Sequence, residues 1–187
     1  IEGNTKFSTL KKNYEKGVEL RGKTIGIVGI GRIGQEVARI ALGLGMKVIA
    51  SDTRIGKASV RVDFYNHQYI NVEIETQPLD QLIQQSDFIT FYVPAQNGAI
   101  IGKAELDQMK HGVAIVNCAR GGVIDEAALI EALDAGKVSF AGLDVFENEP
   151  TPSDVILNHP KISLTPHIGA ATSEAQDRIG TSLASQI

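Results

Sequence analysis

The chain has 187 residues, of which 43% are hydrophobic and 5% aromatic, and its formal net charge is −4 at pH 7. This composition is typical of a globular α/β protein with an aliphatic core. The 18 basic residues are scattered and no apolar run approaches the roughly 20 residues that span a bilayer, so we expect neither a nucleic-acid nor a membrane partner. A single cysteine, Cys118, excludes an internal disulfide and favours a cytoplasmic location.

The first part of the chain predicts an arm followed by a βαβ unit. Residues 1–21 are polar and basic, and we expect them to form an N-terminal arm or a linker helix. Thr24–Val28 is a short apolar run bounded by glycine, which is typical of a strand buried on both faces. Residues 34–44 carry apolar side chains at helical spacing, and Gly45 suits the end of that helix. Residues 47–50 are the next expected strand.

The alternation of strands and helices continues to the end of the chain. The expected helices are 79–85, 103–110, 125–135 and one from Thr172 or Ser173, and the expected strands are 87–93, 113–118, 140–145 and 162–164. Residues 53–77 show no clear pattern beyond one weak strand. This alternation predicts an α/β protein of the Rossmann type, with a doubly wound parallel sheet and helices on both faces.

A glycine-rich segment joins the first strand to the first helix of the βαβ unit. Gly29-Ile30-Gly31-Arg32-Ile33-Gly34 matches G-x-G-x-x-G, which in this context indicates a dinucleotide site. Gly29 permits the tight turn, Gly31 lets a pyrophosphate approach the backbone, and Gly34 lets the helix pack closely on the strand. The N–H groups of Arg32 and Ile33 would meet the phosphates at the positive end of the helix. A tight turn without a ligand is the alternative.

Asp52 follows the second strand of this unit and predicts which dinucleotide binds. Its carboxylate would accept hydrogen bonds from the adenosine ribose and repel a 2′-phosphate, which favours NAD over NADP as the cofactor. Arg54 lies two residues further on and would weaken that repulsion. A turn aspartate without a ligand is the alternative for Asp52.

Polar residues suited to 2-oxo acid chemistry follow three successive strands. Such a substrate needs a cation for its carboxylate and an acid for its carbonyl oxygen, tasks that suit arginine and histidine. Arg120 follows one strand, Glu147 and Glu149 the next, and His167 the last. The alternative for each is a solvated loop residue. We expect Cys118 to be a small buried strand residue.

The other histidines are expected on the surface. They are His67, His111 and His159, which lie in polar loops or beside a basic helix end. Dispersed histidines and one cysteine do not have the spacing of zinc ligands, so we expect no metal site.

From Glu19 onward the chain resembles the D-isomer-specific 2-hydroxyacid dehydrogenases, and within them the D-3-phosphoglycerate dehydrogenases. The resemblance rests on the glycine motif and on four further segments, LRGKT at 20–24, NCARGGVIDE at 117–126, GLDVFENEP at 142–150 and TPHIGAAT at 165–172. It implies that Arg120 binds the substrate carboxylate and that His167 is the acid/base. It also implies that Glu149, the glutamate directly before the proline, is the partner of His167 rather than Glu147.

The resemblance also implies further cofactor contacts. Asp144 would lie near the nicotinamide carboxamide, and Cys118 and Ala119 would line the cofactor through their backbone. The family often has His-Thr or His-Val before the proline of Val93-Pro94, so the contact of Val93 would be backbone or apolar. The expected cofactor-binding residues are Gly29, Gly31, Arg32, Ile33, Gly34, Asp52, Val93, Pro94, Cys118, Ala119, Arg120, Asp144, His167, Gly169 and Ala170.

The resemblance further implies a two-domain enzyme that forms a homodimer or higher homo-oligomer. Residues 22–171 would be the NAD-binding domain, and 172–187 would begin the helix that returns to a substrate domain outside this chain. The substrate would be a 2-hydroxy or 2-oxo acid, with D-3-phosphoglycerate and serine biosynthesis favoured. The alternatives are glyoxylate or hydroxypyruvate reductase, D-lactate dehydrogenase, and an NAD-sensing interaction protein like the corepressors that share this fold.

Overall fold

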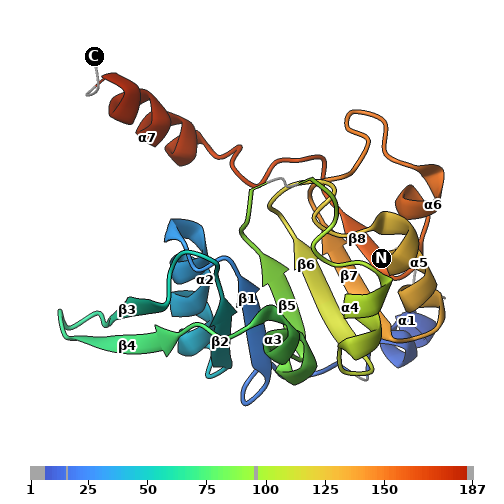
Figure 1. The fold of residues 1–187 in the computed structure, drawn as a ribbon, viewed down its shortest axis with the longest axis horizontal. Coiled ribbons are helices and arrows are strands. Elements are labelled where there is room, and N and C mark those ends of the chain that lie inside the picture. Colours follow the sequence, from blue (N-terminus) through green and yellow to red (C-terminus); the bar gives the residue numbers. More distant parts are fainter. Residues whose placement is uncertain (1–6, 16, 95–96, 185–187) are drawn as a thin grey trace.

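The computed structural model of the chain describes residues 7–15, 17–94 and 97–184 (Figure 1). Its centre is a six-stranded parallel sheet in the order β2-β1-β5-β6-β7-β8. The strands are β1 (Thr24–Val28), β2 (Lys47–Ser51), β5 (Phe88–Phe91), β6 (Val113–Asn117), β7 (Val138–Leu143) and β8 (Ile162–Leu164). The helices are α1 (Phe7–Tyr14), α2 (Arg32–Gly43), α3 (Leu79–Gln85), α4 (Lys103–Gln108), α5 (Glu126–Asp134), α6 (Asp154–Leu157) and α7 (Ser173–Ala184).

Helices cover both faces of the sheet, which confirms the predicted Rossmann-like fold. Adjacent residues of β1 show the two faces: Ile27 belongs to a buried cluster with Ala38 of α2, whereas Val28 belongs to a second cluster. That second cluster contains side chains of α3, α4, α5 and α6. The alternation of Ile27 and Val28 follows from the two-residue repeat of a strand, and it explains why the strands of this sheet are apolar throughout.

The strands end level with one another, and this positions the site. Parallel registry aligns their last residues in the order Ser51, Val28, Phe91, Asn117, Leu143 and Leu164. The loops that follow the six strands therefore start at one edge of the sheet. The strand order reverses between β1 and β5, and ligands bind at this kind of switch point in open α/β sheets.

Residues 53–77 form a two-stranded antiparallel hairpin, so the expectation of one weak strand was wrong. The strands are β3 (Lys57–Asp63) and β4 (Tyr69–Glu75). Ala58, Val60 and Ile74 are buried in the same cluster as α2. Beyond these three residues the hairpin projects from the domain (Figure 1).

The ends of other elements differ slightly from the prediction. β6 ends at Asn117, one residue early, and β7 spans Val138–Leu143 instead of 140–145. The four-residue helix α6 was not expected, because a single turn carries no periodicity. The last helix stands away from the sheet in Figure 1. None of the helices in the described ranges combines the length and apolar character needed to span a bilayer.

Candidate active site

The glycine loop between β1 and α2 leaves backbone open to a ligand. Gly29 has a φ of +96°, and a side chain on Gly34 would clash with the carbonyl oxygen of Gly29. At Gly31 an added Cβ would meet no atom within 4 Å, so a ligand can approach the backbone there. Gly31 is the N-cap of α2 and supplies no side-chain cap. The positive end of α2 therefore faces this open space.

Asp52 lies beside this loop and is held by three backbone N–H groups. Its Oδ2 accepts from Ile30 at 3.0 Å, and its Oδ1 accepts from Arg54 at 2.8 Å and Ile55 at 3.1 Å. Partial burial alone would raise the pKa of Asp52, but the N–H donors and the charge of Arg54 outweigh it and lower the pKa. Asp52 is therefore ionised near neutral pH, the state that opposes a 2′-phosphate.

A cavity of about 860 Å³ extends from the N-terminal turn of α2 across the sheet edge. It brings together most of the predicted cofactor residues, namely Ile33, Val93, Pro94, Cys118, Ala119, Arg120, Asp144, His167, Gly169 and Ala170. Val37, Tyr92 and Ala171 also line the cavity and were not predicted. Val37 has the spacing of a core helix residue, which gave no sign of a cavity position. The cavity, the open backbone at Gly31 and the ionised Asp52 fit a dinucleotide such as NAD.

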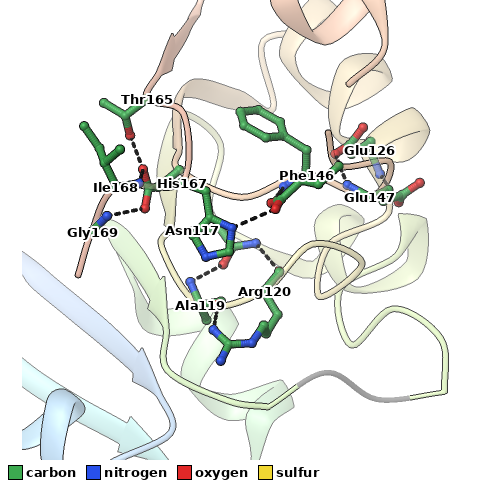
Figure 2. Close-up of polar contacts among 12 residues, drawn as sticks. Asn117, Ala119, Arg120, Glu126, Phe146, Glu147, Thr165, His167, Ile168 and Gly169 are labelled. Atoms are coloured by element: carbon green, nitrogen blue, oxygen red, sulfur yellow. Dashed lines mark hydrogen bonds and ion pairs between the residues drawn. The ribbon is translucent and has the colours of Figure 1, made fainter. Parts of the chain in front are cut away.

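His167 lies at the wall of this cavity (Figure 2) and pairs with Glu149. Nδ1 of His167 lies 2.7 Å from Oε2 of Glu149, and Oε1 of Glu149 accepts from the backbone N–H of Phe146 at 3.0 Å. The hydrogen bond from His167, followed by the one from Phe146, lowers the pKa of Glu149. Both residues of the pair also line a second, largely apolar cavity of about 440 Å³.

Asp144 holds the loop that carries His167. Its carboxylate, in a residue only 3% exposed, accepts from the Thr165 hydroxyl at 2.5 Å and from the N–H groups of Ile168 at 2.9 Å and Gly169 at 2.8 Å. Burial would raise the pKa of Asp144, but these donors outweigh it and lower the pKa. The backbone of His167 is left-handed, with a φ of 53°. Such a conformation persists only when neighbours hold it, and the Asp144 contacts do so.

Asn117 organises the loop that carries Arg120. Its Nδ2 donates to the carbonyl oxygen of Arg120, and its Oδ1 accepts from Ala119 N–H, both at 3.0 Å. The guanidinium of Arg120 donates to the carbonyl oxygen of Ala119 at 2.5 Å. Asn117 is 3% exposed. The sequence interpretation used it only as part of the segment 117–126 and gave it no role of its own, since a buried asparagine at a strand end gives no distinct pattern.

Two further expectations were wrong. Cys118 is exposed at the cavity wall instead of buried, because β6 ends at Asn117. Partial desolvation, and then the charge of Asp144, raises the pKa of the Cys118 thiol. The side chain of His159 is only 8% exposed, because its ring contacts Asp134 at 3.3 Å and accepts from Lys161 N–H.

His67 and His111 are exposed, as expected. Within the part of the chain that the structure describes, no cluster of three or more His, Cys, Asp or Glu residues could hold a metal ion.

The comparison with known families decides the family. Residues 2–169 match the family described as D-isomer specific 2-hydroxyacid dehydrogenase, NAD binding domain. The chain belongs to this family. It is therefore the NAD-binding domain of an oxidoreductase family, as the resemblance implied.

Individual relatives agree with this assignment. The chain is 44% identical over 182 residues to hydroxypyruvate reductase of Thermotoga maritima, covering 95% of the chain and 56% of that protein. It is 44% identical over 174 residues to D-3-phosphoglycerate dehydrogenase of Methanocaldococcus jannaschii, covering 92% of the chain and 32% of that protein. The holo form of D-mandelate dehydrogenase of Rhodotorula graminis superposes with a TM-score of 0.82 at 32% identity, covering 96% of the chain and 51% of that structure. The chain thus spans between a third and just over half of these proteins.

Proposed function

We propose that this domain serves an enzyme that interconverts a D-2-hydroxy acid and its 2-oxo acid with NAD, and that the hydroxy acid is D-3-phosphoglycerate. The observation that carries the proposal is the 2.7 Å contact between His167 and Glu149. His167 lines the same cavity as Arg120. A proton carrier and a cation for a carboxylate thus face one cofactor-sized space.

The residues divide the work by their chemistry. A bound nicotinamide cofactor supplies the hydride. Arg120 binds the substrate carboxylate through its planar fork, which orients the carbonyl carbon. Nδ1 of His167 is engaged by Glu149, which leaves Nε2 to donate a proton to the carbonyl oxygen in reduction and to remove it in oxidation. Glu149 stabilises the imidazolium form through its negative charge.

The whole protein would contain a second domain. This chain covers 56% of the Thermotoga maritima relative and 32% of the Methanocaldococcus jannaschii relative. We propose that 1–21 and 172–187 connect to a substrate domain that closes over the cavity. We also propose a homodimer or higher homo-oligomer in the cytoplasm, acting in serine biosynthesis.

A hydroxypyruvate or glyoxylate reductase is the second candidate, favoured by the 44% identity to the Thermotoga maritima protein. Both candidates use the same relay and differ in the pocket for the rest of the substrate. The NAD-binding residues of this chain therefore do not separate them.

The test measures initial rates of the whole enzyme with NAD and D-3-phosphoglycerate, D-glycerate, glycolate or D-lactate. We expect the highest kcat/KM with D-3-phosphoglycerate. His167→Ala should lower the rate by on the order of 100-fold to 10,000-fold, the range for a lost general acid. Arg120→Ala should raise KM and lower kcat together. A preference for D-glycerate would favour the second candidate. Full activity of the His167 variant would refute the role of His167 as the general acid and base.

A further inference from the structure

Two loops of the candidate site are packed backbone against backbone. One carries Arg120 and leads from β6 into α5, and the other leads from β7 to Glu149. A side chain on Gly121 would clash with the carbonyl oxygen of Phe146, so the backbones of the two loops touch there. The N–H of Asp144 also donates to the carbonyl oxygen of Asn117 at 3.0 Å. The position of each loop therefore depends on the other.

Beyond this contact the loops exchange two side-chain hydrogen bonds. The N–H of Glu126 donates to Oε1 of Glu147 at 3.1 Å, and the N–H of Glu147 donates to Oε1 of Glu126 at 2.9 Å. The two residues are 21 positions apart in the sequence. Figure 2 shows the pair on the side of Phe146 that is opposite to His167. We call this reciprocal arrangement the Glu126–Glu147 clasp.

The clasp is more than a helix cap. Asp125 already caps α5 by accepting from the N–H of Ala128. Two carboxylates that lie close together repel each other, and burial together with the charge of Glu147 raises the pKa of Glu126. The arrangement persists because each carboxylate accepts a backbone N–H of the other loop, and the N-terminal end of α5 favours negative charge.

We propose that Glu126 and Glu147 are positioning residues that keep Glu149 within reach of His167. Glu147 is two residues before Glu149, and the N–H of Phe146, directly before Glu147, donates to Glu149. The clasp fixes this turn on the Arg120 loop, so that the proton relay and the carboxylate-binding cation keep one relative geometry. The catalytic meaning of this proposal rests on the proposed function above.

The direct test is the titration of the Glu149 carboxyl group by carbon-detected NMR in this chain. Glu147→Ala and Glu126→Ala should raise the pKa of Glu149 toward that of an ordinary glutamate, because the turn no longer holds it against His167 and Phe146. Glu147→Gln is the matched control, since its amide oxygen still accepts from Glu126 N–H. It should not raise the pKa of Glu149.

The control separates positioning from charge. Removal of a nearby negative charge lowers the pKa of a carboxylic acid, so a purely electrostatic effect would lower the pKa of Glu149 in both Glu147 variants. That result, or no change in either alanine variant, would overturn the proposal. The midpoint of denaturation of each variant shows that it is folded.

Kinetics of the whole enzyme distinguish this proposal from the proposed function. Glu147→Ala should lower kcat by on the order of 10-fold to 100-fold with a smaller change in KM, as expected for a misplaced catalytic group, and Glu147→Gln should restore most of the loss. An enzyme that converts no 2-hydroxy acid would refute the proposed function while the titration still tests the clasp. A wild-type kcat in Glu147→Ala would refute the positioning role of the clasp while leaving the proposed function intact.

Discussion

Three carboxylates of the site accept hydrogen bonds from backbone N–H groups, and each holds a different part of the site. Asp52 joins the glycine loop to the turn after β2, Asp144 holds the loop of His167, and Glu149 engages the ring of His167. In all three the pKa is lowered, and the N–H donors contribute in each case. These groups are therefore ionised over the working pH range, and their charges act on ligands and on the imidazole without a change of protonation.

The charge of Asp52 should set the choice of cofactor. We expect the chain to bind NAD more tightly than NADP, and Asp52→Asn to reduce the ratio of the two affinities by about 10-fold, which corresponds to about 1.4 kcal/mol of lost repulsion. Calorimetry with both cofactors measures this ratio, and Asp63→Asn, an exposed hairpin residue, is the control. Equal affinities of the wild-type chain for NAD and NADP would show that Arg54 offsets Asp52.

The charge of Glu149 should set the pH range of reduction. Glu149→Gln keeps a hydrogen bond to His167 but removes the charge that stabilises the imidazolium. The pH above which the rate of 2-oxo acid reduction declines should therefore move to lower values in the whole enzyme. Asp134→Asn is the matched control, because it also removes a carboxylate beside a histidine, His159, outside the site. An unchanged pH profile in Glu149→Gln would mean that His167 works without this partner.

At the scale of the element, the sequence predicts best where the apolar pattern is strong. The ranges of β1 and α3 agree with the prediction, because a glycine-bounded aliphatic run and a helical repeat are local signals. The helix expected at 125–135 is α5, which Asp125 caps, and Gly136 after it has a φ of 73°. The hairpin was missed although its strands alternate apolar and polar residues, a signal that differs from the continuous apolar runs of the buried parallel strands.

For the site, too, only local features of the sequence could be predicted. The residue types at the strand ends were predictable, because a hydroxy acid substrate demands a cation and a proton carrier. The hydrogen bonds of Asn117 and the Glu126–Glu147 clasp could not be predicted. The clasp joins residues that are 21 positions apart, and its donors are backbone N–H groups that every sequence has. Only the packing of two loops on each other brings these groups together.

The hairpin should contribute stability only through its inner half. Ile74 is 5% exposed in the cluster beneath α2, whereas Ile70, four residues earlier on the same face of β4, is 52% exposed. Ile74→Ala should therefore lower the free energy of unfolding by about 2–4 kcal/mol, and Ile70→Ala by less than about 0.5 kcal/mol. Urea denaturation of both variants measures the difference. A large loss in Ile70→Ala would show that the outer half of the hairpin is packed in solution.

At the scale of the whole molecule, the topology gathers the chemistry at one edge. All six strands of the main sheet run the same way and end level, so the glycine loop, Asp52, Arg120, Glu149 and His167 follow strands that end at a common edge. The cavity at this edge is lined by residues that follow several of these strands. If the proposed second domain supplies the rest of the substrate pocket, this edge alone suffices for the cofactor but not for the substrate.

The chain by itself should therefore bind NAD but turn over no 2-oxo acid at a useful rate. Hydride transfer requires a substrate held in a near-attack geometry and shielded from water, and a misplaced or mobile substrate forfeits most of that advantage. Calorimetry should detect NAD binding, and the glycine-loop variant Gly31→Val should abolish it by filling the open space beside the backbone. Absorbance of NADH with hydroxypyruvate or 2-oxoglutarate should show no decline above the Gly31→Val background. Robust turnover by the isolated chain would refute the two-domain proposal, because the described cavity would then suffice to hold and shield the substrate.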